Sequence, residues 1–91
     1  MIYIIHFNTK LAHAQHYIGS AADVRARYRA HLNGHGSRIM SAVVNKGIST
    51  RCFVIAEGGK VDERKLKNRK NSSRLCPVCR RRIGVSKEVK L

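Results

Sequence analysis

Acidic residues are scarce in this chain. Five Asp and Glu stand against 19 Lys and Arg, which gives a formal net charge of +14 with the histidines neutral. Such an excess opposes compaction through self-repulsion and attracts polyanions, so nucleic acid is the first partner to expect. The sequence also lacks a long apolar run and a strongly amphipathic basic helix, and we therefore expect no membrane association.

Cysteine is rare as well. Three cysteines, an odd number, do not make the disulfide framework of a small secreted protein. The first five residues, MIYII, lack the charged region with which a signal peptide begins. We therefore expect a cytoplasmic location. At 91 residues the chain should form one domain with a small hydrophobic core.

The hydrophobic pattern predicts an α/β fold with the element order ββααβα. The predicted strands are residues 2–7, 14–19 and 49–56, and the predicted helices are residues 22–32, 37–45 and 61–70. The first two strands should form a hairpin in a small three-stranded sheet, antiparallel or mixed, flanked by helices. In the third strand, alternation predicts one face with Cys52, Val54 and Ala56. Residues 1–70 form the predicted core, and residues 71–91 a basic C-terminal extension with a CPVC turn.

A strand, a turn and a helix meet between His16 and His31. The strand ends in Tyr17-Ile18-Gly19, and the helix begins near Asp23; the side chain of Ser20 or Asp23 can cap it. Arg27 and His31 are four residues apart on this helix, so both reach the same spot. Arginine offers a planar fork of donors for a phosphate, and histidine can hold or move a proton near neutral pH. These side chains, together with Tyr17, can converge on one phosphate.

These residues resemble the signature of the GIY-YIG nucleases. Ile2-Tyr3-Ile4 is similar to the first half, with Met1 where the family has glycine, and Tyr17-Ile18-Gly19 is similar to the second half. In the family's pattern an arginine follows ten residues after the second tyrosine and a histidine or tyrosine four residues later, which Arg27 and His31 match. The family has a metal-binding glutamate on the helix after the last strand, where Glu63 fits. The resemblance covers roughly residues 1–70.

The resemblance implies the same fold and a metal-dependent endonuclease that hydrolyses DNA phosphodiester bonds. Glu63 would hold one Mg²⁺ or Mn²⁺, and Arg27 would contact the scissile phosphate. Tyr3, Tyr17 and His31 would surround the attacking water, with either tyrosine as the base. Double-stranded DNA is the expected substrate, and a homodimer or a partner protein could supply specificity, because no separate recognition domain is visible.

Cys76-Pro77-Val78-Cys79 is half of a zinc knuckle. Structural zinc needs four ligands, and the chain has no second CxxC or HxxxH pair. Cys52 and one histidine could complete a site with Cys76 and Cys79 if the extension folds back on the third strand; the alternative is a tight turn with packed thiols. The remaining histidines are predicted to be surface or rim residues: His6, His13, His16 and His35.

Several cations outside the signature are predicted to contact DNA, namely Arg25, Arg29, Arg38, Lys67, Arg80, Arg81 and Arg82. For the run of residues 80–82 the alternative is a solvated tail. A second interpretation is a non-catalytic basic nucleic-acid-binding protein with a zinc-knuckle-like tail. In that case Arg27 and His31 are a solvated pair, and the tyrosines are ordinary strand aromatics. The ordered set of Tyr, Tyr, Arg, His and Glu favours the nuclease, because a protein that only binds has no reason to keep it.

Overall fold

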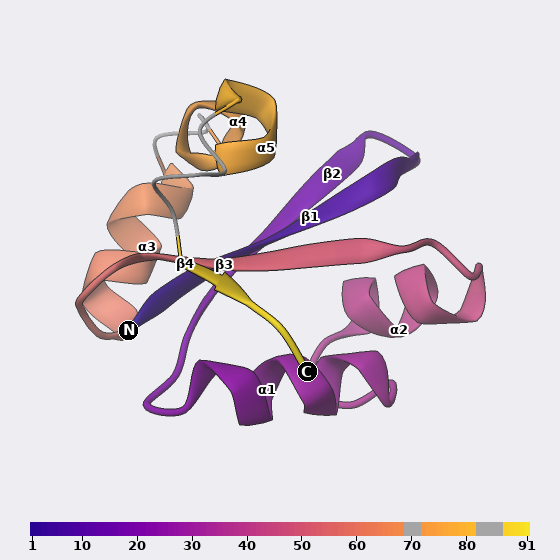
Figure 1. The fold of residues 1–91 in the computed structure, drawn as a ribbon, viewed down its shortest axis with the longest axis horizontal. Coiled ribbons are helices and arrows are strands. Elements are labelled where there is room, and N and C mark those ends of the chain that lie inside the picture. The colour runs from indigo at the N-terminus through magenta and orange to yellow at the C-terminus, as the bar shows by residue number, and fades with distance from the viewer. Residues whose placement is uncertain (69–71, 82–86) are drawn as a thin grey trace.

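The centre of the molecule is a four-stranded antiparallel sheet with the strand order β2-β1-β3-β4 (Figure 1). The computed structural model describes residues 1–68, 72–81 and 87–91. The strands are β1 (Ile2–Leu11), β2 (Ala14–Ser20), β3 (Thr50–Ala56) and β4 (Lys87–Val89). The helices are α1 (Val24–Leu32), α2 (Arg38–Asn45), α3 (Lys60–Asn68), α4 (Ser72–Leu75) and α5 (Pro77–Arg80).

The α/β class is confirmed, but the expected count of three strands is wrong. The fourth strand lies in the C-terminal extension and pairs with β3 through Cys52 and Val89, Phe53 and Glu88, and Val54 and Lys87. Its attachment is strengthened by Arg51, which donates to both carboxylate oxygens of Glu88 at 2.6 and 2.9 Å. Three residues are too few to show a strand period, which is why the sequence pattern missed β4.

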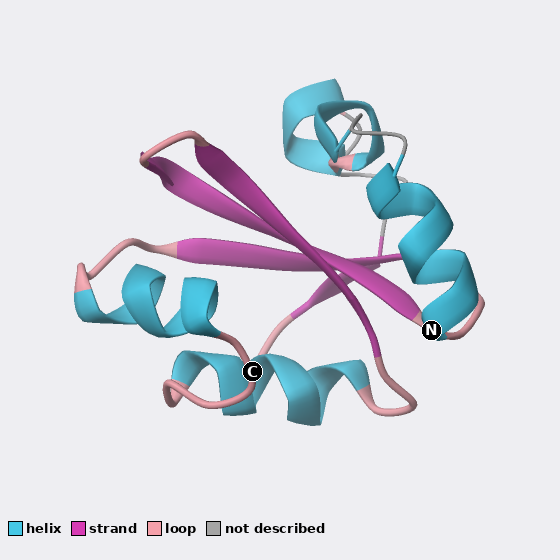
Figure 2. Ribbon diagram, turned by 180° about the vertical axis from the view of Figure 1, so that it is seen from behind, coloured by secondary structure: helices cyan, strands magenta, loops and turns pink. Residues whose placement is uncertain are grey.

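The helices cover opposite faces of the sheet (Figure 2). Helices α1 and α2 pack on one face and begin at side-chain caps, since the N–H of Ala26 donates to Asp23 and that of Met40 to Ser37. Side chains of α3, α4 and α5 pack on the other face. Among the described residues, no helix has the length and apolar character needed to cross a membrane.

Two cores result from the alternation of side chains along the strands. The α1–α2 face holds Tyr3, Ile5 and Phe7 of β1, and the opposite face holds Ile2 and Ile4. A register shift between β1 and β3 pairs Tyr3 with Val54 but Ile2 with Ala56. This irregularity packs Ala56 with Phe53 and Ile55 instead of with Cys52, so the face predicted for Ala56 is wrong.

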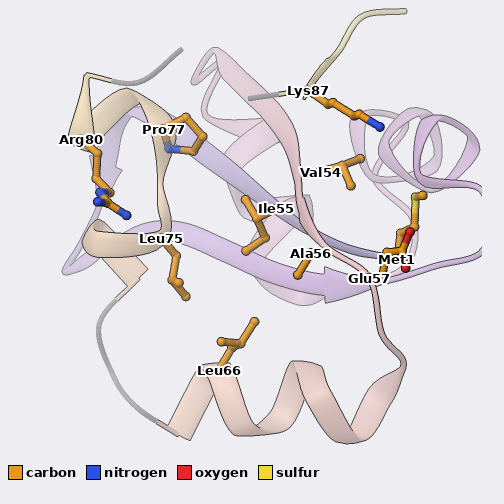
Figure 3. A pocket seen from close by; sticks show the side chains of 10 residues that line it. All are labelled: Met1, Val54, Ile55, Ala56, Glu57, Leu66, Leu75, Pro77, Arg80 and Lys87. Atoms are coloured by element: carbon orange, nitrogen blue, oxygen red, sulfur yellow. The ribbon is translucent and has the colours of Figure 1, made fainter. Parts of the chain in front are cut away.

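A pocket of about 520 Å³ lies on the face that α3, α4 and α5 cover. Leu66 of α3, Leu75 of α4 and Ile55 of β3 line it, as Figure 3 shows. Among the described residues that line it there is no residue to which the resemblance assigns a chemical role. The two candidate sites of the molecule lie elsewhere.

Candidate functional site

Three aromatic side chains meet on the α1–α2 face of the sheet. The hydroxyl of Tyr3 and Nε2 of His31 are hydrogen-bonded at 2.8 Å. The ring of Tyr17 lies edge-on to the imidazole, with 5.0 Å between the ring centres, and 6.3 Å from the ring centre of Tyr3. Strands β1 and β2 and helix α1 thus bring together three of the five residues predicted from the signature.

Two glycines make room for the side chains of Tyr3 and His31. Gly19 lies opposite Tyr3 in the β1–β2 ladder, and a Cβ at residue 19 would overlap the phenol ring of Tyr3. Gly36 has a positive φ of 98°, and a Cβ there would lie 3.2 Å from Cε1 of His31. The glycine of Tyr17-Ile18-Gly19 is therefore required by the side chain of the neighbouring strand.

The Tyr3–His31 pair is buried and uncharged at neutral pH. Tyr3 is 1% exposed and His31 is 0% exposed. Burial, followed by the nearby Tyr17, raises the pKa of the Tyr3 hydroxyl well above its ordinary value of 10. Burial lowers the pKa of His31 below 6.5, an effect that the backbone of His35 partly offsets and the charge of Arg27 increases. Among the described residues, Nδ1 of His31 has no hydrogen-bond partner at favourable distance and angle.

The two charged residues of the signature stand on α1 and α3. Arg27 is exposed on α1, and the Glu63 side chain on α3 is 20% exposed. The charge of Arg27 lowers and that of Glu63 raises the pKa of Tyr3, so both act on its hydroxyl electrostatically. Lys67 links α3 to the aromatic rings, because its Nζ lies 3.5 Å from a Glu63 oxygen and 5.2 Å from the ring centre of Tyr17.

The cations predicted to contact DNA are exposed wherever the structure describes them. Their side chains project from α1, α2, α3 and α5 and from the residue after α5: Arg25, Arg29, Arg38, Lys67, Arg80 and Arg81. Arg82 lies outside the described residues. The described cations are therefore accessible to a polyanion.

A second cluster occupies the opposite face of the sheet. His6 and His16 are directly paired across the β1–β2 ladder, whereas Cys76 directly precedes α5 and Cys79 lies within it. Nδ1 of His6, Nε2 of His16 and the two sulfur atoms all lie within 4.8 Å of one another. Four nitrogen and sulfur donors at this spacing could hold a metal ion.

Two expectations drawn from the sequence are wrong for this cluster. His6 is 6% exposed and therefore is not a surface or rim residue. Cys52 does not join Cys76 and Cys79, because it packs into the core of the α1–α2 face, where burial raises the pKa of its thiol to about 12. The ligands that complete the cluster come from β1 and β2, not from the third strand.

Burial also sets the protonation of the cluster. It lowers the pKa of His16 to about 4, with a smaller contribution from His6, and lowers that of His6 below 6.5, with a contribution from Arg51. Burial and the neighbouring Cys76 raise the pKa of the Cys79 thiol. At neutral pH both imidazoles are therefore neutral.

Comparison of the chain with protein-family models, curated proteins and solved structures finds no match. What the two sites do must therefore follow from their own residues.

Proposed function

We propose that the protein is a divalent-metal-dependent endonuclease that hydrolyses DNA phosphodiester bonds with a site of the GIY-YIG type. One observation carries the proposal: Tyr3, Tyr17 and His31 meet on one face of the sheet. These three residues come from β1, β2 and α1, so local structure alone does not explain why they meet, and the remaining two signature residues stand on α1 and α3. A protein that only binds nucleic acid needs exposed cations and no such arrangement.

Hydrolysis needs an activated water, stabilisation of the charge on the phosphate and a proton for the leaving oxygen. Arg27, exposed on α1 four residues before His31, would bind the scissile phosphate through its fork of donors. Glu63 fits a Mg²⁺ or Mn²⁺ ligand, because it is partly exposed, and such ions take one or two carboxylates and keep several waters. Bound there, the ion would lower the pKa of a water and neutralise developing charge.

The two tyrosines differ in access, and this suggests different roles. Tyr17 is half-buried, so a surface water can reach it, whereas Tyr3 is 1% exposed. We therefore propose that Tyr17, and not Tyr3, contacts the attacking water. The buried Tyr3–His31 pair would hold the rings in position and keep a neutral imidazole beside Tyr17.

The test compares two glutamates that carry the same charge. Glu63→Gln should slow cleavage of a supercoiled plasmid in Mg²⁺ or Mn²⁺ by at least about 100-fold, as expected for loss of a group that stabilises the transition state. The matched control is Glu57→Gln, since Glu57 is exposed in the turn after β3. Both variants lose one acid from the same strongly basic chain and should bind DNA alike. Equal cleavage rates for the two variants would contradict the role of Glu63.

A second candidate function is non-catalytic nucleic-acid binding. It is favoured by the burial of Tyr3 and His31, because a hydrogen bond between two buried polar groups also serves stability alone. Such a protein would bind DNA with a steep salt dependence and leave the plasmid intact in Mg²⁺ and Mn²⁺. The same plasmid assay separates the two functions.

A further inference from the structure

The His6, His16, Cys76 and Cys79 cluster has the dimensions of a tetrahedral metal site. With metal–nitrogen bonds near 2.05 Å and metal–sulfur bonds near 2.3 Å, the edges of a tetrahedron are about 3.3 Å between nitrogens and about 3.5 Å between nitrogen and sulfur. The two ring nitrogens are 3.2 Å apart. The nitrogen–sulfur distances are 3.3 Å for Cys76 and His6, 3.8 Å for Cys79 and His6, and 3.3 Å for Cys79 and His16.

The donor set selects the metal. Imidazole nitrogen and thiolate sulfur suit Zn²⁺, whereas Mg²⁺, Ca²⁺ and Mn²⁺ prefer oxygen. Two thiolates balance the two charges of the ion and the imidazoles stay neutral, so the filled site carries no net charge. Four protein ligands also leave no open position for a substrate. A closed site of this kind is structural.

We propose that His6, His16, Cys76 and Cys79 bind one structural Zn²⁺ that fastens the C-terminal extension to the β1–β2 hairpin. The backbone of α5 positions the two sulfur atoms. Pro77 stands in its first turn, and the N–H of Arg80 donates to the carbonyl of Cys76 at 3.0 Å. The hairpin prepares the two nitrogens through the direct pairing of His6 with His16.

The ion would close the second core of the protein. Cys76 is buried with Ile4, Ile18 and Phe53, and the side chains of Leu75 and Val78 pack against this group. The described helices of the extension have only four residues each, too few to be stable on their own. A metal that joins them to the hairpin would supply the stability that such short helices lack.

Zinc would also support the helix that carries Glu63. Leu66 of α3 packs into the same core as Leu75 and Val78, while Glu63 and Lys67 of α3 lie toward the tyrosines. Loss of zinc should therefore loosen α3 and reduce any activity that depends on Glu63. The zinc site itself does not rest on the proposed nuclease function, because none of its four ligands belongs to the proposed nuclease site.

The experiment measures metal content, spectrum and stability on the full chain. Purified protein should contain one zinc per chain, and exchange for Co²⁺ should give the visible bands of a tetrahedral ion together with a thiolate charge-transfer band. Removing zinc with a chelator should lower the midpoint of thermal unfolding by at least about 10 °C, and added Zn²⁺ should restore it. None of these readouts depends on DNA cleavage.

Cys79→Ser is the variant of choice, because Cys79 is exposed and its loss leaves no hole in a core. It should weaken zinc binding by more than about 100-fold. Loss of a group that only hydrogen-bonds to a ligand weakens metal binding by about 10- to 100-fold, and loss of a ligand itself should cost more. Two controls keep one zinc per chain, Cys52→Ala in the other core and His35→Ala on the surface. Zinc-free protein that melts at the same temperature with and without Zn²⁺, or zinc retained by Cys79→Ser but lost from Cys52→Ala, would overturn the proposal.

Discussion

Gly19→Ala tests whether the hairpin is built around the ring of Tyr3. The added Cβ would meet the hydroxyl, Cζ and Cε1 of Tyr3, with the Cε1 contact at 2.9 Å. Tyr3 has no free space to move into, because it is 1% exposed and hydrogen-bonded to His31. Either the ring shifts and breaks that bond, or the two strands separate locally.

The expected size follows from overpacking. Forcing a methyl group into a filled core costs about 1–3 kcal/mol. The matched control is Gly59→Ala, because a Cβ at residue 59 meets nothing within 4 Å and its φ is not positive. Gly59 is the N-cap of α3, because the N–H of Glu63 donates to its carbonyl, and alanine is less favourable than glycine there by up to about 1 kcal/mol. Gly19→Ala should therefore be the less stable of the two variants by roughly 1–2 kcal/mol.

Urea unfolding of zinc-loaded protein measures this difference. A slope of roughly 1–2 kcal/mol per molar urea is expected for a chain of this size, so the midpoints should differ by about 1 M. A ring displaced by about 1 Å should also slow cleavage of bound DNA by about 100-fold in Gly19→Ala alone. Equal midpoints for the two glycine variants would refute the account of Gly19.

Three other predictions concern charged residues. Arg27→Ala should slow single-turnover cleavage of bound DNA by about 100- to 1,000-fold, whereas Arg29→Ala on the same helix should only weaken binding; equal, mild effects would favour a plain basic helix. Replacing Arg80 and Arg81 with alanine should flatten the slope of log K against log salt by about 1.8 if each contacts a phosphate, and an unchanged slope would place the DNA elsewhere. The hydrogen bonds from Arg51 lower the pKa of Glu88 below 4.5, so its ionised form stabilises the fold above that pH. Measured by urea, the free energy of unfolding of the wild type should exceed that of Glu88→Gln by about 0.2–1 kcal/mol at pH 7, and this difference should shrink as the pH falls below 4.5. A difference independent of pH would contradict the ion pair.

The parts of the fold that local signals determine could be predicted from the sequence. The β-branched and aromatic run of residues 2–7 predicts a strand of the sheet, and the predicted helix starts near Asp23 and residue 37 agree with the side-chain caps of α1 and α2. Arg27 and His31 do lie on one helix, but Arg27 is exposed and His31 is buried. These signals lie within a few residues of the structure they specify.

What could not be predicted depends on register and on distant contacts. Strand β1 continues to Leu11, and an irregularity between His6 and Leu11 shifts its pairing with β2. One residue of shift turns a side chain to the other face of a sheet, so the pairing of His6 with His16 was hidden. The position of Cys76 beside His6, 70 residues away in the chain, depends on that same register.

Single-turnover cleavage by wild-type protein tests the central claim most directly. Zinc-loaded protein is first bound to supercoiled plasmid in buffer without other divalent ions, and Mg²⁺ or Mn²⁺ is then added while nicked and linear DNA are measured. The proposed site predicts intact plasmid before the addition and cleavage after it, with a rate that saturates as the metal concentration rises. Fully bound plasmid that stays intact at every concentration of both metals would contradict the nuclease assignment and leave nucleic-acid binding as the function.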